Sequence, residues 1–118
     1  MTLQRDILCV FCPRAQRIGG GYHPPTKKIL LCQNNGDGAA ALGKVLTHEM
    51  IHAYDDARTA KLGHPLDWTV CAQHACTEIR ASNLSSECRW LDELQVPCLQ
   101  HPRALPAAAC RQLPAADR

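Results

Sequence analysis

Long apolar runs are missing from this 118-residue sequence. No stretch approaches the roughly 18 apolar residues of a membrane-spanning helix, and no signal-peptide pattern opens the chain. Any contact with a membrane is therefore expected to be peripheral. Aromatic residues are also few, with two Trp, two Tyr and one Phe, and the formal net charge is only +2. This charge is too small to predict a nucleic-acid partner, and the length fits one small domain.

Two motifs are present only in part. The run Gly19–Gly21 lacks the Gly-Lys-Ser/Thr ending of a phosphate-binding loop, so it predicts a plain turn. Cys9 and Cys12 form one CxxC, but no second pair follows at finger spacing, which disfavours a structural four-cysteine zinc site. A redox role for the pair is disfavoured too, because no strand leads directly into a helix there.

Cysteine itself is abundant, with eight residues in the chain. The even number favours disulfides in an oxidising compartment, and the alternative is a reduced protein that uses cysteine as a small core residue. Cys71 and Cys76 are five residues apart in a predicted helix, where their side chains point about 140° apart. We therefore expect these two not to pair with each other.

The segment that carries chemistry is His48-Glu49-Met50-Ile51-His52, an HExxH motif. Residues four apart lie on one face of a helix, so His48 and His52 can offer two imidazoles to one zinc ion. Glu49 lies about 100° around the helix, where it can accept a proton from a zinc-bound water instead of binding the metal. The motif predicts zinc-assisted peptide hydrolysis, with Glu49 as general base.

The secondary structure before this motif is predicted to include short strands. Residues 7–11 are apolar and predict a strand or a docking turn, whereas residues 13–27 contain the glycine and proline clusters of turns. Residues 28–32, KILLC, predict a buried strand. A strand here would belong to a small sheet whose edge can hold extended substrate.

Two helices and a tail are predicted to follow. Residues 39–59 predict a helix with Asp37 as N-cap, and residues 67–81 predict a second one with Asp67 as N-cap. The predicted fold class is α+β, a small zincin-like domain with a short β-hairpin or sheet, the HExxH helix and a second packed helix. We expect residues 1–94 to form this metallopeptidase domain and residues 95–118, rich in proline and alanine, to be a poorly ordered tail.

A catalytic zinc site needs a third protein ligand. Asp67, His74 and Glu78 lie on one stripe at the border of the second helix's apolar face. Glu78 is the favoured ligand because it completes the His, His, Glu set common in zinc peptidases. His74 or Tyr54 could donate a hydrogen bond to the developing oxyanion, and the sequence does not choose between them.

The order of motifs resembles the mitochondrial inner-membrane metalloprotease family. The residues that carry the resemblance are LCQNN at 31–35, THEMIHAYDDAR at 47–58, DW at 67–68 and HACTEIRASNLSSEC at 74–88. The GGY at 20–22 and the Cys9/Cys12 pair are similar to that family as well. The chain differs at Ala57, where many members have cysteine, and at Ser86, where glycine is usual.

The resemblance implies a disulfide-rich zinc endopeptidase of the intermembrane space, attached peripherally to the mitochondrial inner membrane. Its partner would be an ATP synthase membrane-sector subunit that it processes and helps to assemble. His48 and His52 match the family's zinc ligands, and Glu49 matches its catalytic glutamate. The alternative is a non-catalytic, chaperone-like assembly factor with a structural zinc, which the retention of Glu49 disfavours.

Overall fold

The computed structural model describes residues 3–16 and 18–87. After a short helix α1 (Leu3–Asp6), these residues form strands β1 (Ile7–Val10), β2 (Gly20–His23) and β3 (Lys28–Cys32), with the 3-10 turn η1 (Arg14–Gln16) between β1 and β2. Two long helices follow, α2 (Ala39–Lys61) and α3 (Cys71–Leu84). The domain is thus a small α+β unit, as predicted.

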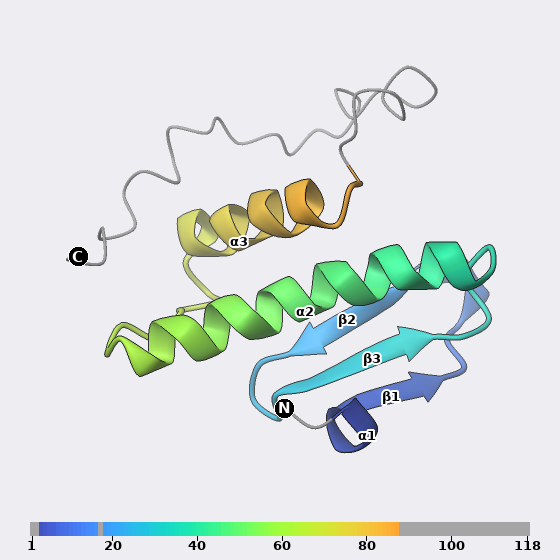
Figure 1. The fold of residues 1–118 in the computed structure, drawn as a ribbon, viewed down its shortest axis with the longest axis horizontal. Coiled ribbons are helices and arrows are strands. Elements are labelled where there is room, and N and C mark those ends of the chain that lie inside the picture. Colours follow the sequence, from blue (N-terminus) through green and yellow to red (C-terminus); the bar gives the residue numbers. More distant parts are fainter. Residues whose placement is uncertain (1–2, 17, 88–118) are drawn as a thin grey trace.

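The three strands form one sheet in the order β1-β3-β2 (Figure 1). Strand β1 pairs with β3 in parallel, with Ile7 opposite Ile29, and β2 pairs with β3 in antiparallel, with Tyr22 opposite Ile29. The order leaves one edge of β2 without a partner strand among the described residues. The prediction of a plain turn at Gly19–Gly21 is therefore wrong, because Gly20 and Gly21 belong to this edge strand.

One face of the sheet packs against α2. Alternate residues of β3 point to this face, so Ile29 and Leu31 are buried while Leu30 remains partly exposed. They form the core with Ala53 of α2, and Val45 and Leu46 pack around it. Apolar burial of this kind fixes the position of α2 along the sheet.

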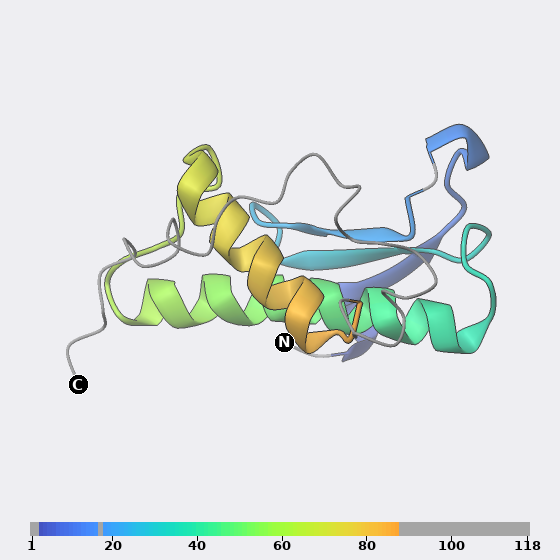
Figure 2. The ribbon, with the colours of Figure 1, turned by 90° about the horizontal axis from the view of Figure 1, so that it is seen from above.

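Helix α3 packs on α2 away from the strands and crosses it at an angle (Figures 1 and 2). It begins at Cys71, so the predicted start at Asp67 is wrong. Asp67 instead accepts hydrogen bonds from the backbone N–H and the hydroxyl of Thr69, which closes a local turn before the helix. The helix also continues to Leu84, three residues beyond its predicted end.

The start of α2 differs in one detail from its prediction. Gly38 is the N-cap, with φ of 92°, and no side chain caps the helix, so the assignment of Asp37 as N-cap is wrong. The positive φ explains why glycine occupies this position. No helix in residues 3–16 and 18–87 combines the length and apolar character needed to cross a membrane.

The described cysteines are partly oxidised. A disulfide joins Cys12 to Cys32, and Cys76 is also disulfide-bonded, whereas Cys9 and Cys71 are free and exposed. Cys71 and Cys76 are therefore not paired with each other, as predicted. Cys12 bonds to β3 instead of to Cys9, so the CxxC does not form a redox disulfide.

The segment predicted to be a tail, residues 95–118, lies outside the described residues, and the division at residue 94 stays a prediction.

Candidate metal centre and active-site cleft

Helix α2 brings His48 and His52 to the same side, one turn apart. Three alanines at its start have the highest helix propensity, and the helix runs without a break through the HExxH motif. The two imidazole rings lie 4.8 Å apart, centroid to centroid. His52 is buried, and the side chain of His48 is mostly covered. Their proximity is thus a direct consequence of helical periodicity.

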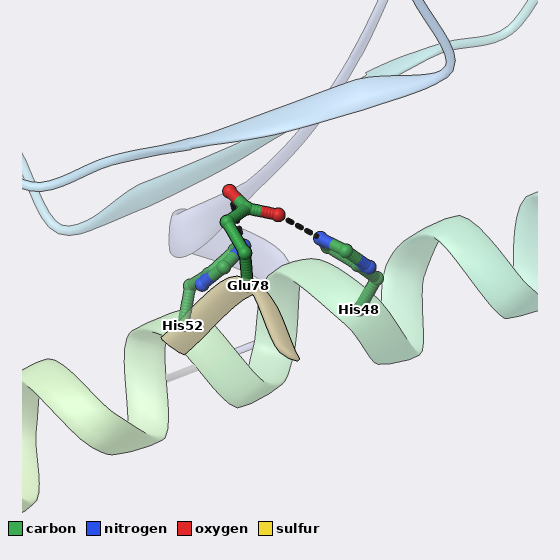
Figure 3. Close-up of side chains that lie close together, drawn as sticks. All are labelled: His48, His52 and Glu78. Atoms are coloured by element: carbon green, nitrogen blue, oxygen red, sulfur yellow. Dashed lines mark ion pairs between the residues drawn. The ribbon is translucent and has the colours of Figure 1, made fainter. Parts of the chain in front are cut away.

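Glu78 of α3 points its carboxylate towards both imidazole rings (Figure 3). One carboxylate oxygen lies 3.3 Å from Nε2 of His48, and the other lies 3.4 Å from Nε2 of His52. Hydrogen bonds from His48 and then His52 hold the pKa of Glu78 well below its usual range. The three residues are the one group of potential metal ligands found among the described residues, with their ligand atoms within 4.8 Å of one another.

The spacing of the three residues allows one metal ion to lie between them. Each offers one ligand atom, a ring nitrogen or a carboxylate oxygen, and these atoms all lie within 4.8 Å of one another. The cluster of His48, His52 and Glu78 could therefore hold a metal ion.

The second nitrogen of each histidine is also engaged. Nδ1 of His48 lies 3.0 Å from a carboxylate oxygen of Glu87, and Nδ1 of His52 lies 2.9 Å from the hydroxyl of Thr77. Such contacts fix the orientation of metal-binding imidazoles and leave Nε2 free for the metal. No pattern in the sequence predicts Thr77 or Glu87 as a partner of these histidines. Thr77 directly precedes Glu78 on α3, but no local signal connects Glu87 with a histidine 39 residues earlier.

Glu49 lies beside the cluster and is buried, with 8% of its surface exposed. Burial raises the pKa of its carboxyl group, while the two histidines and a hydrogen bond from the backbone N–H of Tyr22 act in the opposite direction. The result is a carboxylate held in place with a raised proton affinity, which suits a group that accepts and returns a proton.

The cluster opens into a cleft of about 360 Å³ between β2, α2 and α3. The residues that line it are Gly20, Gly21, Tyr22, Pro24, His48, Glu49, His52, Trp68, His74 and Glu78.

Of the two candidates for stabilising an oxyanion, only His74 lies in this cleft. Its Nε2 is 3.2 Å from Glu78, and its side chain is half exposed. Tyr54 is 60% exposed and is not among the residues that line the cleft. The structure therefore removes Tyr54 as a candidate.

Asp67 also lies away from the cleft lining, where Thr69 occupies its carboxylate. Hydrogen bonds from the Thr69 hydroxyl and backbone lower the pKa of Asp67. Among the three candidates for the third ligand, only Glu78 belongs to the cluster with both histidines.

Trp68, which falls within the predicted helix 67–81, forms an aromatic wall of the cleft. It lies in the loop before α3, with its ring centroid 5.8 Å from His52, 5.7 Å from His74 and 5.9 Å from Tyr22. The hydroxyl of Tyr22 donates to Asp56 at 2.6 Å, which ties the edge strand β2 to α2. Burial raises the pKa of the Tyr22 hydroxyl, and this hydrogen bond is the second largest cause.

Comparison with known proteins agrees with this geometry. The model of the peptidase M76 family matches residues 1–110. The mitochondrial inner membrane protease ATP23 of Saccharomyces cerevisiae is 45% identical over 89 residues, which cover 75% of this chain and 36% of the relative. Its homologue in Homo sapiens is 41% identical over 78 residues, or 65% of this chain and 30% of the relative.

The chain thus spans about a third of the length of the curated relatives it matches. No solved structure matches the chain.

Proposed function

Because the chain belongs to the peptidase M76 family, we propose that it is a zinc-dependent metalloendopeptidase. One observation carries the proposal. His48, His52 and Glu78 bring three ligand atoms within 4.8 Å of one another, and the buried carboxylate of Glu49 lines the same cleft. Metal ligands alone would serve a structural site equally well, but a structural site has no need of a base that is not a ligand.

His48, His52 and Glu78 would hold the zinc through two Nε2 atoms and one carboxylate oxygen. Zinc bound there would polarise the scissile carbonyl and lower the pKa of a water molecule towards neutrality. Three protein ligands leave one tetrahedral position for water or substrate, as a catalytic site requires.

Glu49 would move the proton during hydrolysis. Its carboxylate accepts a proton from the attacking water and then delivers it to the leaving amine. The hydrogen bond from the Tyr22 backbone N–H holds the carboxylate at the cleft wall for both steps. His74, the half-exposed imidazole on the opposite wall, would donate to the oxygen that gains negative charge.

The substrate would lie in an extended conformation along β2. This strand pairs with β3 on one side, and its residues Gly20, Gly21 and Tyr22 line the cleft. An extended peptide can add to such an edge through main-chain hydrogen bonds, which position it without demanding a particular sequence. The zincin-like arrangement expected from the sequence, a substrate strand beside an HExxH helix, is consistent with this placement.

The names of the relatives and the resemblance of the sequence support a proposal for substrate and location. They are named mitochondrial inner membrane proteases, and we extend to this chain a peripheral location on the intermembrane-space side of that membrane. The disulfide between Cys12 and Cys32 fits an oxidising compartment. An ATP synthase membrane-sector subunit would be the protein that it cleaves and helps to assemble.

Glu49→Gln tests this function directly. The substitution removes the base but retains all three ligands, so zinc stoichiometry should stay unchanged while peptide cleavage falls by at least about 10²-fold. Met50→Leu is the matched control, because Met50 follows Glu49 in the sequence, is partly exposed and does not line the cleft.

Metal analysis and a peptide-cleavage assay with and without chelator give the two readings. If the protein binds zinc and the Glu49→Gln variant cleaves peptide as fast as the wild type, the proposed mechanism is contradicted. Zinc binding without any cleavage by the wild type would favour the assembly factor with a structural zinc.

A further inference from the structure

Behind the metal-facing side of His52, four residues of α2 and α3 form a continuous chain of hydrogen bonds. Nδ1 of His52 lies 2.9 Å from the Thr77 hydroxyl, and that hydroxyl donates to Asp55 at 3.2 Å. Nε of Arg80 donates to both oxygens of the same carboxylate, at 3.2 and 2.9 Å. We call this the buried hydrogen-bond chain.

The chemistry of its members sets the direction of every bond. Arg80 can only donate, and an ionised Asp55 can only accept. The single hydroxyl proton of Thr77 therefore goes to Asp55, so that a lone pair of the hydroxyl oxygen faces His52. In the neutral form that binds zinc, the imidazole of His52 would then carry its one proton on Nδ1 and present the lone pair of Nε2 to the metal.

Burial favours this one arrangement of hydrogen bonds over alternatives. Thr77 is 2% exposed, Asp55 3% and His52 4%, so bulk water has little access to these three residues. A hydrogen bond is electrostatically stronger in such surroundings, and a buried group without a partner is costly. His48 differs, because its partner Glu87 binds it directly and remains partly exposed.

We infer that Thr77 and Asp55 are positioning residues that fix the tautomer and the ring orientation of His52 for metal binding. The inference rests on the proposed zinc site and assigns to α3 a role besides supplying Glu78. It also explains why two consecutive residues of α3, Thr77 and Glu78, both face the same histidine.

The test compares Thr77→Val with Thr77→Ser. Valine has nearly the shape of threonine but no hydroxyl, whereas serine retains the hydroxyl. We expect Thr77→Val to weaken zinc binding by about 10–100-fold, and Thr77→Ser to stay within about threefold of the wild type. Zinc affinity is measured by competition with a chromogenic chelator, and the absorption spectrum of the cobalt-substituted protein reports the geometry of the site.

Thr59→Val is the matched control on α2. Its hydroxyl donates to the backbone carbonyls of Asp55 and Asp56, not to the carboxylate of Asp55. Thr59→Val makes the same chemical change as Thr77→Val, close to the buried hydrogen-bond chain but without interrupting it. We expect no loss of zinc affinity.

A second variant covers the case in which Thr77→Val does not fold. Asp55→Asn keeps the size of the side chain and an oxygen for Arg80, but removes the charge that orients the Thr77 hydroxyl. We expect a smaller loss of zinc affinity, by about threefold to tenfold.

The outcomes separate this inference from the function on which it rests. A wild type that binds no zinc overturns both. A wild type that binds zinc, together with a folded Thr77→Val or Asp55→Asn variant of unchanged affinity, overturns the positioning role alone. Equal losses in Thr77→Val and Thr77→Ser would also overturn it, because the hydroxyl would then be irrelevant.

Discussion

The Nδ1 atom of His48 lies 3.0 Å from a carboxylate oxygen of Glu87, a residue that follows α3. An ionised carboxylate accepts hydrogen bonds and donates none, so this contact keeps the one remaining proton on Nδ1 when His48 binds zinc as a neutral imidazole. Nε2 of His48 is then left to face Glu78, 3.3 Å away. The end of α3 and the turn beyond it therefore orient a ligand that belongs to α2.

Two substitutions of Glu87 should weaken zinc binding to different degrees. Glu87→Ala leaves Nδ1 of His48 without its partner, and we expect zinc affinity to fall by about 10–100-fold. Glu87→Gln retains a carbonyl oxygen that can accept the same hydrogen bond, so its loss should be smaller. Chelator competition measures both, and an unchanged affinity in Glu87→Ala would contradict this role.

The pH dependence of zinc binding should reflect the same contacts. In the metal-free protein, hydrogen bonds to Glu78 and then Glu87 raise the pKa of His48 to about 10. Zinc binds neutral imidazole, so binding below this pH must release a proton from His48. Apparent affinity should therefore rise with pH between about 7 and 10, by up to tenfold per pH unit for this one proton.

Calorimetric titration of zinc in buffers with different ionisation enthalpies counts the released protons. Glu87→Gln removes one of the two groups that raise the pKa of His48, so it should release fewer protons near pH 9. A proton count near zero at pH 8 in the wild type would contradict the raised pKa.

The same pKa shift predicts how the stability of the metal-free protein depends on pH. The folded-state pKa of His48, about 10, lies above the reference value of about 6.5 for an unfolded chain. The stabilising contribution is therefore complete below about pH 6.5 and is lost as pH rises towards 10. Urea unfolding in the presence of chelator should show a decline over this interval, and a rising stability there would contradict the assignment.

Local periodicity in the sequence was sufficient to predict the pair of histidines. Residues four apart must share a face of any helix, so the proximity of His48 to His52 did not depend on the rest of the fold. Glu78 is favoured because it completes a His, His, Glu set, and its position depends on how α3 packs on α2; the structure brings it to both histidines.

Other features depend on tertiary contacts that no local pattern reveals. Glycine favours turns in sequence statistics, yet Gly20 lies in a strand that pairs with β3. Glycine fits this position because the carbonyl oxygen of Leu30 and the side chain of Val45 leave no room for a Cβ atom. Asp67 has the chemistry of a helix N-cap, but its carboxylate closes a turn with Thr69 instead. Thr77 and Glu87 acquire their partners only through the packing of α3 on α2.

Ser86 offers a test of backbone strain beside the metal centre. Its φ is 65°, a left-handed conformation that is unfavourable for residues with a Cβ atom and that glycine adopts readily. Ser86→Gly should relieve this strain, partly offset by the greater freedom of glycine in the unfolded chain, for a net gain of about 0.5–1 kcal/mol in the free energy of unfolding.

Ser85→Gly is the control, because the φ of Ser85 is −76° and glycine brings no relief there. It should lower stability by at least about 0.5 kcal/mol. Urea unfolding of the metal-free variants measures both changes. A Ser86→Gly variant less stable than the wild type would contradict the strain.

Gly20 and Gly21 form a matched pair on the edge strand that lines the cleft. A Cβ atom on Gly20 would meet the carbonyl oxygen of Leu30 at 2.6 Å and a methyl group of Val45 at 2.9 Å, whereas one on Gly21 would meet nothing within 4 Å. Gly20→Ala must therefore move β2 away from its neighbours, with an expected cost of about 1–3 kcal/mol. Gly21→Ala should change stability by less than about 0.5 kcal/mol.

The same two variants also distinguish the role of the edge strand from the role of the metal centre. None of His48, His52 and Glu78 belongs to β2, so Gly20→Ala should leave the zinc stoichiometry intact while it raises KM for a peptide substrate. Chemical unfolding, metal analysis and steady-state cleavage of both variants give the three readings. Equal KM values in a destabilised Gly20→Ala variant and the wild type would show that the substrate does not depend on this strand.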